Sequence, residues 1–139
     1  MSLNLCPKQG TIVICDFKGF IIPEMVKRRP AIVISKIKSR AKLCTIVPCS
    51  TTPPNPVESY HYKLVVAPPL PKPYNKDYHW VKADMIYNVS WDRLQLPFSG
   101  KDDAGKRIYD LRIISDEDLV EIQKCVLHSL GLSHLTNYI

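Results

Sequence analysis

A few polar side chains lie beside short apolar runs and could together bind and cleave a phosphodiester. Glu24 and Arg29 precede one run of β-branched residues, and Ser50 follows the next run. An arginine guanidinium neutralises phosphate oxygens in bidentate geometry, and a hydroxyl can donate a hydrogen bond beside it. Metal-free RNA cleavage must deprotonate the ribose 2′-hydroxyl and stabilise the charge that develops around phosphorus. Glu24 is chemically suited to the first task and Arg29 to the second.

The same residues have a plainer interpretation. Ser50, Thr51 and Thr52 could form a hydroxyl-rich turn beside a solvated basic loop that has no catalytic role. Residue types alone leave both interpretations open.

Basic residues are concentrated in the first part of the chain. The net charge is +6, from 19 basic and 13 acidic residues, and only two of the acidic ones precede residue 58. The segment from Met25 to Val57 has no acidic residue but seven basic ones: Lys27, Arg28, Arg29, Lys36, Lys38, Arg40 and Lys42. A one-sided basic stripe attracts polyanions through counterion release, which favours nucleic acid as a partner. The alternative is an ordinary solvated surface.

Other catalytic classes have less support in the sequence. None of the four histidines has a cysteine or carboxylate at a recognised metal-ligand spacing, so no metal site is expected. The chain has five glycines, and they form neither a phosphate-binding loop nor a dinucleotide-binding motif. A serine-hydrolase elbow is also absent from the sequence. We therefore expect no cofactor.

Length and composition indicate a single globular domain, residues 1–139. The hydrophobic fraction of 45% and the charged fraction of 23% exclude a wholly disordered chain. No stretch approaches the roughly 20 apolar residues of a membrane helix, and no signal-peptide pattern opens the chain. Five cysteines without a CxxC pair fit a reducing compartment. We expect a cytoplasmic protein with no membrane partner.

The elements that must position these residues are mostly short strands. Apolar runs rich in β-branched residues predict strands at 10–17, 30–35, 43–48 and 60–66. Further along we expect a strand pair or a strand and turn at 80–89, a polar loop at 99–107 and a closing strand at 108–114. The loops between the first strands are too short for crossover helices, so neighbouring strands should be antiparallel. Arg29 and Ser50 would then converge at one rim.

One helix is predicted near the C-terminus. Ser115 with the acidic residues after it is typical of a capped helix start, and Gly131 of a helix end. Between them, apolar residues recur at helical spacing: Leu119, Ile122, Val126 and Leu130. The expected fold class is mainly β, with this C-terminal helix laid against a small barrel.

Four segments, taken in order, resemble the PemK/MazF family of toxin endoribonucleases. The family reads roughly GDIVWVDF, then E-x4-RPAVVLS, then VPxT followed by Thr or Ser, then ADQ. The matching segments are residues 10–17, 24–35, 46–51 and 81–86. Each motif alone is weak, but four in the right order and spacing are specific. The resemblance covers about residues 10–130.

The resemblance implies an SH3-like small barrel of the CcdB/MazF type, usually a homodimer, that cleaves single-stranded RNA such as mRNA without metal. In the family the products are a 2′,3′-cyclic phosphate and a 5′-hydroxyl. Arg29 would act on the scissile phosphate, Ser50 would position it, and Glu24 is an acid–base candidate. The other expected RNA contacts are Lys27, Arg28, Thr51, Tyr87, Lys38 and Arg40. The expected protein partner is an antitoxin with a disordered acidic segment.

The chain also departs from the family pattern. Thr11 and Met85 replace an aspartate and a glutamine, and Tyr87 replaces a basic residue, although its ring could stack on a base. The proline-rich insertion near residues 67–79 is larger than in compact members. The alternative function is a non-catalytic toxin of the CcdB type, which docks on DNA gyrase, or another binding module on the same barrel. The retained Arg29 and Ser50 pair favours the nuclease.

Overall fold

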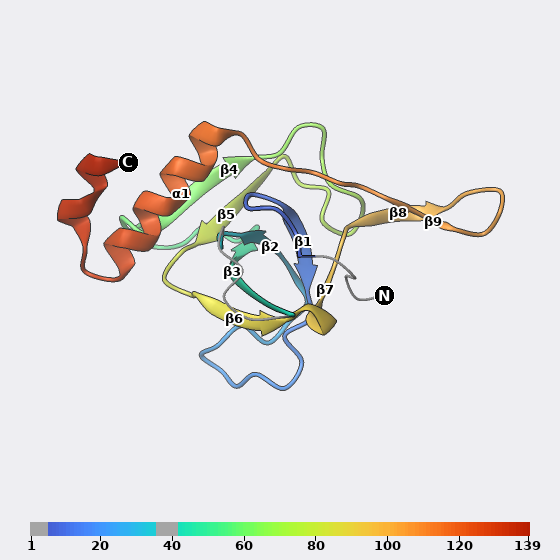
Figure 1. Cartoon of the computed structure of the whole chain (residues 1–139), viewed down its shortest axis with the longest axis horizontal. Coiled ribbons are helices and arrows are strands. Elements are labelled where there is room, and N and C mark those ends of the chain that lie inside the picture. The colour runs from blue at the N-terminus through green and yellow to red at the C-terminus, as the bar shows by residue number, and fades with distance from the viewer. Residues whose placement is uncertain (1–5, 36–41) are drawn as a thin grey trace.

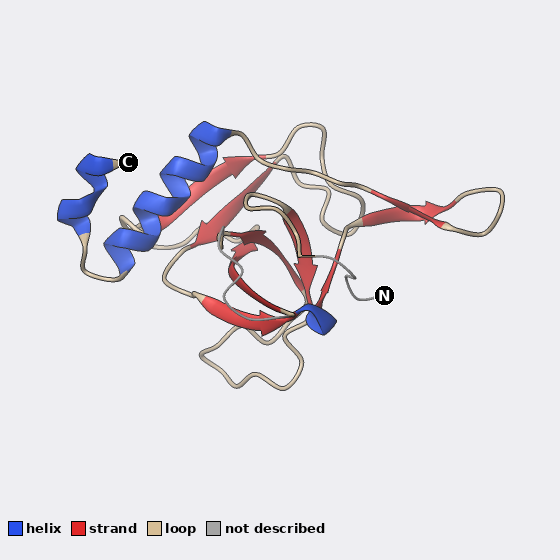
Figure 2. Ribbon diagram, viewed as in Figure 1, coloured by secondary structure: helices blue, strands red, loops and turns tan. Residues whose placement is uncertain are grey.

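The computed structural model describes residues 6–35 and 42–139 and is mostly β, with a helix near the C-terminus (Figures 1 and 2). The strands are β1 (Ile12–Cys15), β2 (Arg29–Val33), β3 (Leu43–Ser50), β4 (His61–Val65), β5 (Tyr78–Lys82), β6 (Tyr87–Ser90), β7 (Leu94–Gln95), β8 (Phe98–Lys101) and β9 (Arg107–Tyr109). The helices are the short η1 (Trp91–Arg93), α1 (Asp116–Ser129) and η2 (Ser133–Tyr138). The predicted fold class is confirmed.

Strand β3 connects the two parts of the main sheet. It pairs with β2 on one side and, on the other, first with β6 and then with β5. The strand order is β4-β5-β3-β2-β1-β7, with β6 beside β3, and every registered pairing is antiparallel. The helix α1 contacts β4 and lies beside it in Figure 1.

Alternate residues of the central strands face two buried clusters. Ile12 and Ile32 belong to the cluster that α1 covers with Ile122 and Cys125. Because successive residues of a strand point to opposite faces, their neighbours pack into a second cluster. This second cluster contains Val13, Cys15, Phe17, Ala31, Val33, Cys44, Ile46, Val89, Trp91 and Leu94. The two clusters hold the central strands from both sides.

The third strand is longer than predicted. The sequence places its end at Pro48, but β3 continues to Ser50, which pairs with Trp80 of β5. Along the edge of β3 that faces β6 and β5, the registered pairs with β6 stop at Ile46, and the pairs with β5 begin at Cys49. Pro48 therefore lies in the gap between β6 and β5, where its missing N–H breaks no registered pair with either strand, while it still pairs with Ala31 of β2 on the other side.

The region from residue 98 to 114 was predicted only in part: β9 (Arg107–Tyr109) overlaps the strand expected at 108–114, but the loop expected at 99–107 contains most of β8. Together β8 and β9 form a hairpin that projects from the rest of the molecule (Figure 2). Asp102 shapes its tip, because its carboxylate accepts hydrogen bonds from the backbone N–H groups of Ala104 and Lys106, both at 2.9 Å. Beyond the hairpin only Ile113 forms a bridge, to Thr11. A hairpin without a buried face lacks the apolar alternation from which strands are predicted.

The C-terminal helix was predicted correctly. The Ser115 hydroxyl accepts a hydrogen bond from the backbone N–H of Asp118 at 3.1 Å and caps the helix start. Gly131 has a φ of 75°, which a helix-ending residue of this type adopts without strain. Among residues 6–35 and 42–139, no helix has both the length and the apolar character needed to cross a membrane.

Candidate active site at the ends of β2 and β3

Arg29 and Ser50 lie at the same end of the sheet. Arg29 is the first residue of β2 and Ser50 is the last residue of β3. The last registered pair between these strands is Ala31 with Pro48, and the same register continued by two residues sets Arg29 level with Ser50. Directly opposite residues of neighbouring strands point to the same face of a sheet, as do residues two apart on one strand. The side chains of Arg29 and Ser50 therefore belong to one face.

The environment of Ser50 favours an anion. The residue is 7% exposed, and its hydroxyl oxygen accepts a hydrogen bond from the backbone N–H of Thr52 at 3.2 Å, which leaves the hydroxyl proton available. The Nε of Arg29 and the indole Nε1 of Trp80, the cross-strand partner of Ser50, are both buried without an acceptor among the described residues. Buried N–H groups without acceptors are costly, and a phosphate oxygen is an acceptor of the right chemistry for an arginine at this strand end.

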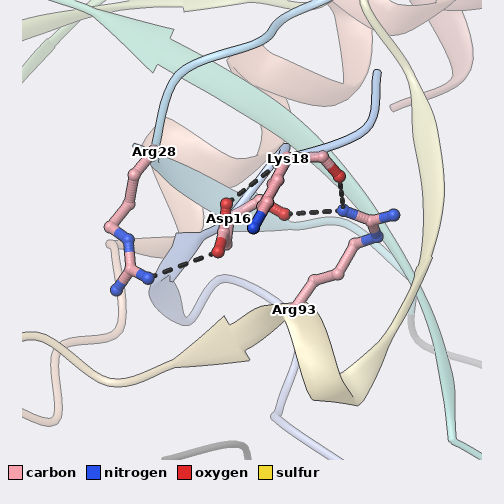
Figure 3. A network of polar contacts seen from close by, with 4 residues as sticks. All are labelled: Asp16, Lys18, Arg28 and Arg93. Atoms are coloured by element: carbon pink, nitrogen blue, oxygen red, sulfur yellow. Dashed lines mark hydrogen bonds and ion pairs between the residues drawn. The ribbon is translucent and has the colours of Figure 1, made fainter.

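The loop between β1 and β2 is anchored at its base by a polar network (Figure 3). Asp16 accepts a hydrogen bond from the backbone N–H of Lys18 at 3.0 Å and lies 3.3 Å from Nη2 of Arg28. The Nη1 of Arg93 donates to the carbonyl oxygens of Asp16, at 3.0 Å, and Lys18, at 2.7 Å. The guanidinium of Arg93 also lies 4.8 Å from the ring centre of Phe20. Arg93 therefore ties this loop to the chain just before β7.

Tyr87, the first residue of β6, also anchors the loop between β1 and β2. Its ring centre lies 5.3 Å from that of Phe17 and 5.3 Å from that of Phe20, and its hydroxyl oxygen accepts the backbone N–H of Met25 at 2.9 Å. The predicted base-stacking ring thus has protein side chains as its ring neighbours.

Among the described residues, the remaining predicted site residues do not lie on strands of the sheet. Glu24 is exposed, and its carboxylate accepts the backbone N–H of Ile21 at 2.8 Å within a turn of the loop. Lys27 is exposed and Thr51, next to Ser50, is half-buried. Two further predicted RNA contacts, Lys38 and Arg40, lie outside the described residues.

Cysteine and metal chemistry have little support nearby. Burial raises the pKa of Cys15 and of Cys49 to about 12, so neither thiol supplies a thiolate nucleophile near neutral pH. In the part of the chain that the structure describes, no three His, Cys, Asp or Glu side chains gather at metal-binding distance.

Three residues near the site were not singled out in the sequence: Arg93, Trp80 and Tyr74. Trp80 directly precedes the fourth family-like segment, so the β3–β5 register would have pointed to it. Arg93 binds a loop 75 residues earlier in the chain, and no sequence pattern indicates such a contact. Burial raises the pKa of Tyr74, while the guanidinium charges of Arg28 and Arg29 oppose the shift. The Tyr74 hydroxyl therefore lies within electrostatic reach of both arginines.

Known proteins resemble this chain over nearly all of its length. The Escherichia coli K12 protein YifN is 27% identical over 157 aligned residues, which cover 99% of this chain and 100% of YifN. The structure of MazF (form I) from Deinococcus radiodurans matches with a TM-score of 0.66 at 18% identity, covering 92% of this chain and 99% of that one. An endoribonuclease from a mycobacterial species, solved with its cognate antitoxin, matches with a TM-score of 0.61 at 17% identity, covering 91% and 97%.

The structural matches show a shared fold over most of this chain. The family model described as "PemK-like, MazF-like toxin of type II toxin-antitoxin system" matches residues 8–130. Because that match spans most of the sequence, the chain belongs to the PemK-like, MazF-like toxin family of type II toxin–antitoxin systems.

Proposed function

We propose that this protein is an endoribonuclease that cuts single-stranded RNA, chiefly mRNA, without a metal ion, as the toxin of a toxin–antitoxin pair. The observation that carries the proposal is the placement of Arg29 and Ser50 at adjacent strand ends, with the Nε of Arg29 buried and without an acceptor among the described residues. Membership of the toxin family supports it. Relatives with the same fold are named as endoribonuclease and MazF.

In this proposal the ribose 2′-hydroxyl loses its proton and its oxygen attacks phosphorus, while the bond from phosphorus to the 5′-oxygen breaks and that oxygen takes up a proton from water. The products are a 2′,3′-cyclic phosphate and a 5′-hydroxyl. Arg29 stabilises the negative charge that develops on the phosphate oxygens, because a fixed guanidinium is worth most where charge increases in the transition state. Ser50 donates its hydroxyl proton in a hydrogen bond to the same phosphate, held in place by the Thr52 N–H. Neither step needs a cofactor.

Glu24 has a conditional role. Its carboxylate is a chemically suitable acceptor for the 2′-hydroxyl proton, but in the described conformation it is bound within the turn at Ile21. The proposal gives Glu24 that role only when substrate draws the loop toward Arg29. Lys27, Arg28 and Thr51 then contact neighbouring phosphates, as do Lys38 and Arg40 in the basic stretch.

The protein partner in this proposal is an antitoxin whose acidic, disordered segment covers the RNA site. Such a segment competes with phosphate for Arg28 and Arg29, so inhibition weakens as salt rises from about 50 to 200 mM. A second copy of the chain is the other proposed partner. Light scattering at micromolar concentration should give about twice the mass of 15.9 kDa.

The test is incubation of the purified protein with a long RNA in EDTA, followed by mapping and chemical identification of the new ends. We expect cuts with 5′-hydroxyl and cyclic-phosphate termini. Intact RNA in the presence of folded protein would overturn the proposal and leave a non-catalytic toxin of the CcdB type. Cuts that appear only after a divalent metal ion is added would refute the metal-independent step.

A further inference from the structure

The proline-rich segment between β4 and β5 forms one wall of a cleft of about 190 Å³. This segment has no part in the site described above. It contributes Pro71, Lys72, Pro73 and Tyr74 to the cleft. The opposite wall comes from β1, the loop before β2 and the chain around β7 and β8: Ile14, Arg28, Gln95, Pro97 and Phe98.

The lining of this cleft combines positive charge with flat apolar surface. Arg28 and Lys72 bring two cationic groups, and the lining contains no carboxylate. Tyr74 and Phe98 bring two aromatic rings. The Phe98 ring already has Tyr109 and the Arg107 guanidinium as neighbours, and Tyr74 packs in part against the cluster that α1 covers, so Tyr74 is the better candidate for a new ring contact. The volume is below the roughly 300–1,000 Å³ of pockets for drug-sized ligands, so the cleft suits one planar group and not several.

The cleft adjoins the proposed scissile-phosphate site. Arg28 lines the cleft, and the next residue, Arg29, begins β2 beside the end of β3 that carries Ser50. Both guanidinium charges act on the Tyr74 hydroxyl, whose pKa burial raises. A group bound beside Arg28 in the cleft is therefore one residue along the chain from the arginine that we propose holds the cut phosphate.

Arg28 can be released for a ligand at little cost. Its ion pair with Asp16 is 3.3 Å long, and the two side chains are 50% and 41% exposed. Exposed pairs of this kind contribute little to stability, so a phosphate can replace Asp16 as the partner of Arg28.

We propose that this cleft binds one base of single-stranded RNA beside the cut phosphate, with Tyr74 stacking on the base and Lys72 and Arg28 neutralising its phosphates. The inference rests on the proposed ribonuclease function and makes the proline-rich segment a determinant of where the RNA is cut. Single-stranded nucleic acid presents the matching chemistry, a planar base joined to a phosphate. An acidic peptide would use the cations but gain nothing specific from the rings.

The first experiment measures where the protein cuts. The wild type and the Tyr74→Ala, Tyr74→Phe and Lys72→Ala variants are given the same long RNA, and the sequence around every new end is read. We expect Tyr74→Ala to lose the base preference at one position next to the cut, while Tyr74→Phe keeps it. The matched controls are Tyr60→Ala, at a half-buried tyrosine that stacks on His61 outside the cleft, and Lys76→Ala, at an exposed lysine of the same segment.

The second experiment measures binding without cleavage. A single-stranded RNA with a 2′-deoxy ribose at the mapped cut and a photoreactive thiouridine beside it is titrated into each variant. Tyr74→Ala should weaken affinity about tenfold or more, as expected for the loss of one base stack. Lys72→Ala should lower the slope of log affinity against log salt by about one phosphate contact. The photochemical crosslink should fall on Tyr74 or Phe98.

The outcomes separate this inference from the ribonuclease proposal. If the wild type cuts RNA but the cleft variants keep its cut sites, affinity and salt slope, the base-binding cleft is wrong. If the variants weaken binding of the antitoxin segment and leave RNA binding unchanged, the cleft is an antitoxin site and the inference is also wrong. If the wild type cuts no RNA, the ribonuclease proposal fails, and a crosslink to unmodified single-stranded RNA that carries thiouridine decides whether the cleft binds a base. If Tyr74→Ala does not fold, the cut sites and salt dependence of Lys72→Ala and the crosslink to the wild type decide whether the cleft binds a base.

Discussion

The strand ends and the β1–β2 loop hold their functional candidates in different ways. Arg29 and Ser50 belong to registered ladders, opposite Cys15 and Trp80 respectively, so the buried sheet fixes their backbones. Glu24 and its neighbours lie on an exposed loop that is attached by a few hydrogen bonds and ring contacts. The strand pair can change position only if the sheet deforms, whereas the loop can move while the sheet stays intact.

This difference predicts a division of labour. A group that stabilises a transition state must be held in place before the reaction, which suits residues on the sheet. A group that collects substrate gains from an exposed loop that can adapt to it. We therefore expect variants at the strand ends to slow the chemical step and variants in the loop to weaken binding.

The largest expected effect is at Arg29. Arg29→Ala should lower the single-turnover rate of RNA cleavage by about 10²–10³-fold, because it removes a donor to the transition state. The adjacent variant Arg28→Ala is the control, and it should mainly weaken binding and reduce its salt dependence. Thermal unfolding should show that both variants are folded. If both variants cleave like the wild type, the strand-end site is wrong.

The next largest effect should come from Glu24. Glu24→Gln keeps an oxygen for the Ile21 N–H, so stability should not change, and cleavage should fall by about tenfold because only a transient loop position uses the carboxylate. The measurement is the rate against pH at saturating RNA. A 10²–10⁴-fold loss of rate is typical of a fixed general base. Such a loss would show that Glu24 in the loop contributes as much to the chemical step as Arg29 at the strand end, and would contradict the division of labour.

A smaller effect is expected when the loop is untied from the rest of the protein. Arg93→Ala removes two hydrogen bonds to loop carbonyls and the contact with Phe20, which should lower stability by about 1–3 kcal/mol. RNA affinity should fall severalfold, while the rate at saturating RNA stays near that of the wild type. Lys106→Ala, in the projecting hairpin, is a control that should change neither quantity. A large loss of rate with unchanged affinity would contradict the division of labour.

The smallest effect concerns acid. Burial lowers the pKa of His79 in β5 below its ordinary value near 6.5. The unfolded chain therefore binds this proton more readily, so the stability that neutral His79 contributes is present above about pH 6.5 and is lost as the pH falls below it. Unfolding midpoints measured from pH 7.5 to pH 5 should decline, and His79→Leu should make the decline shallower. An unchanged slope in His79→Leu would show that other groups cause it.

The sequence predicted the parts of the molecule that follow from local chemistry. The apolar runs predicted β1 to β4, the Ser115 cap predicted α1, and antiparallel pairing placed Arg29 near Ser50 at one rim. Each of these depends on residues close together in the chain, or on a pairing rule with few alternatives.

The parts that the sequence did not predict depend on distant contacts. The end of β3 could not be placed, because Pro48 normally ends a strand and only the change of partner from β6 to β5 accommodates it. The hairpin of β8 and β9 has no buried face and therefore no apolar pattern. The role of Arg93 and the cleft at Tyr74 both arise from segments that meet only in the folded chain.

Strand β3 pairs with β2, β5 and β6, and these strands are made at different times during synthesis of the chain. Arg29 and Ser50 are made early, within the first 50 residues, but Trp80, the cross-strand neighbour of Ser50, comes 30 residues later in the chain. At a translation rate of about 5–20 residues per second, that segment follows within seconds. The helix that covers one face of the sheet is made later still. A nascent chain thus carries both residues that we propose bind phosphate before the strand and the helix that complete their support have been made.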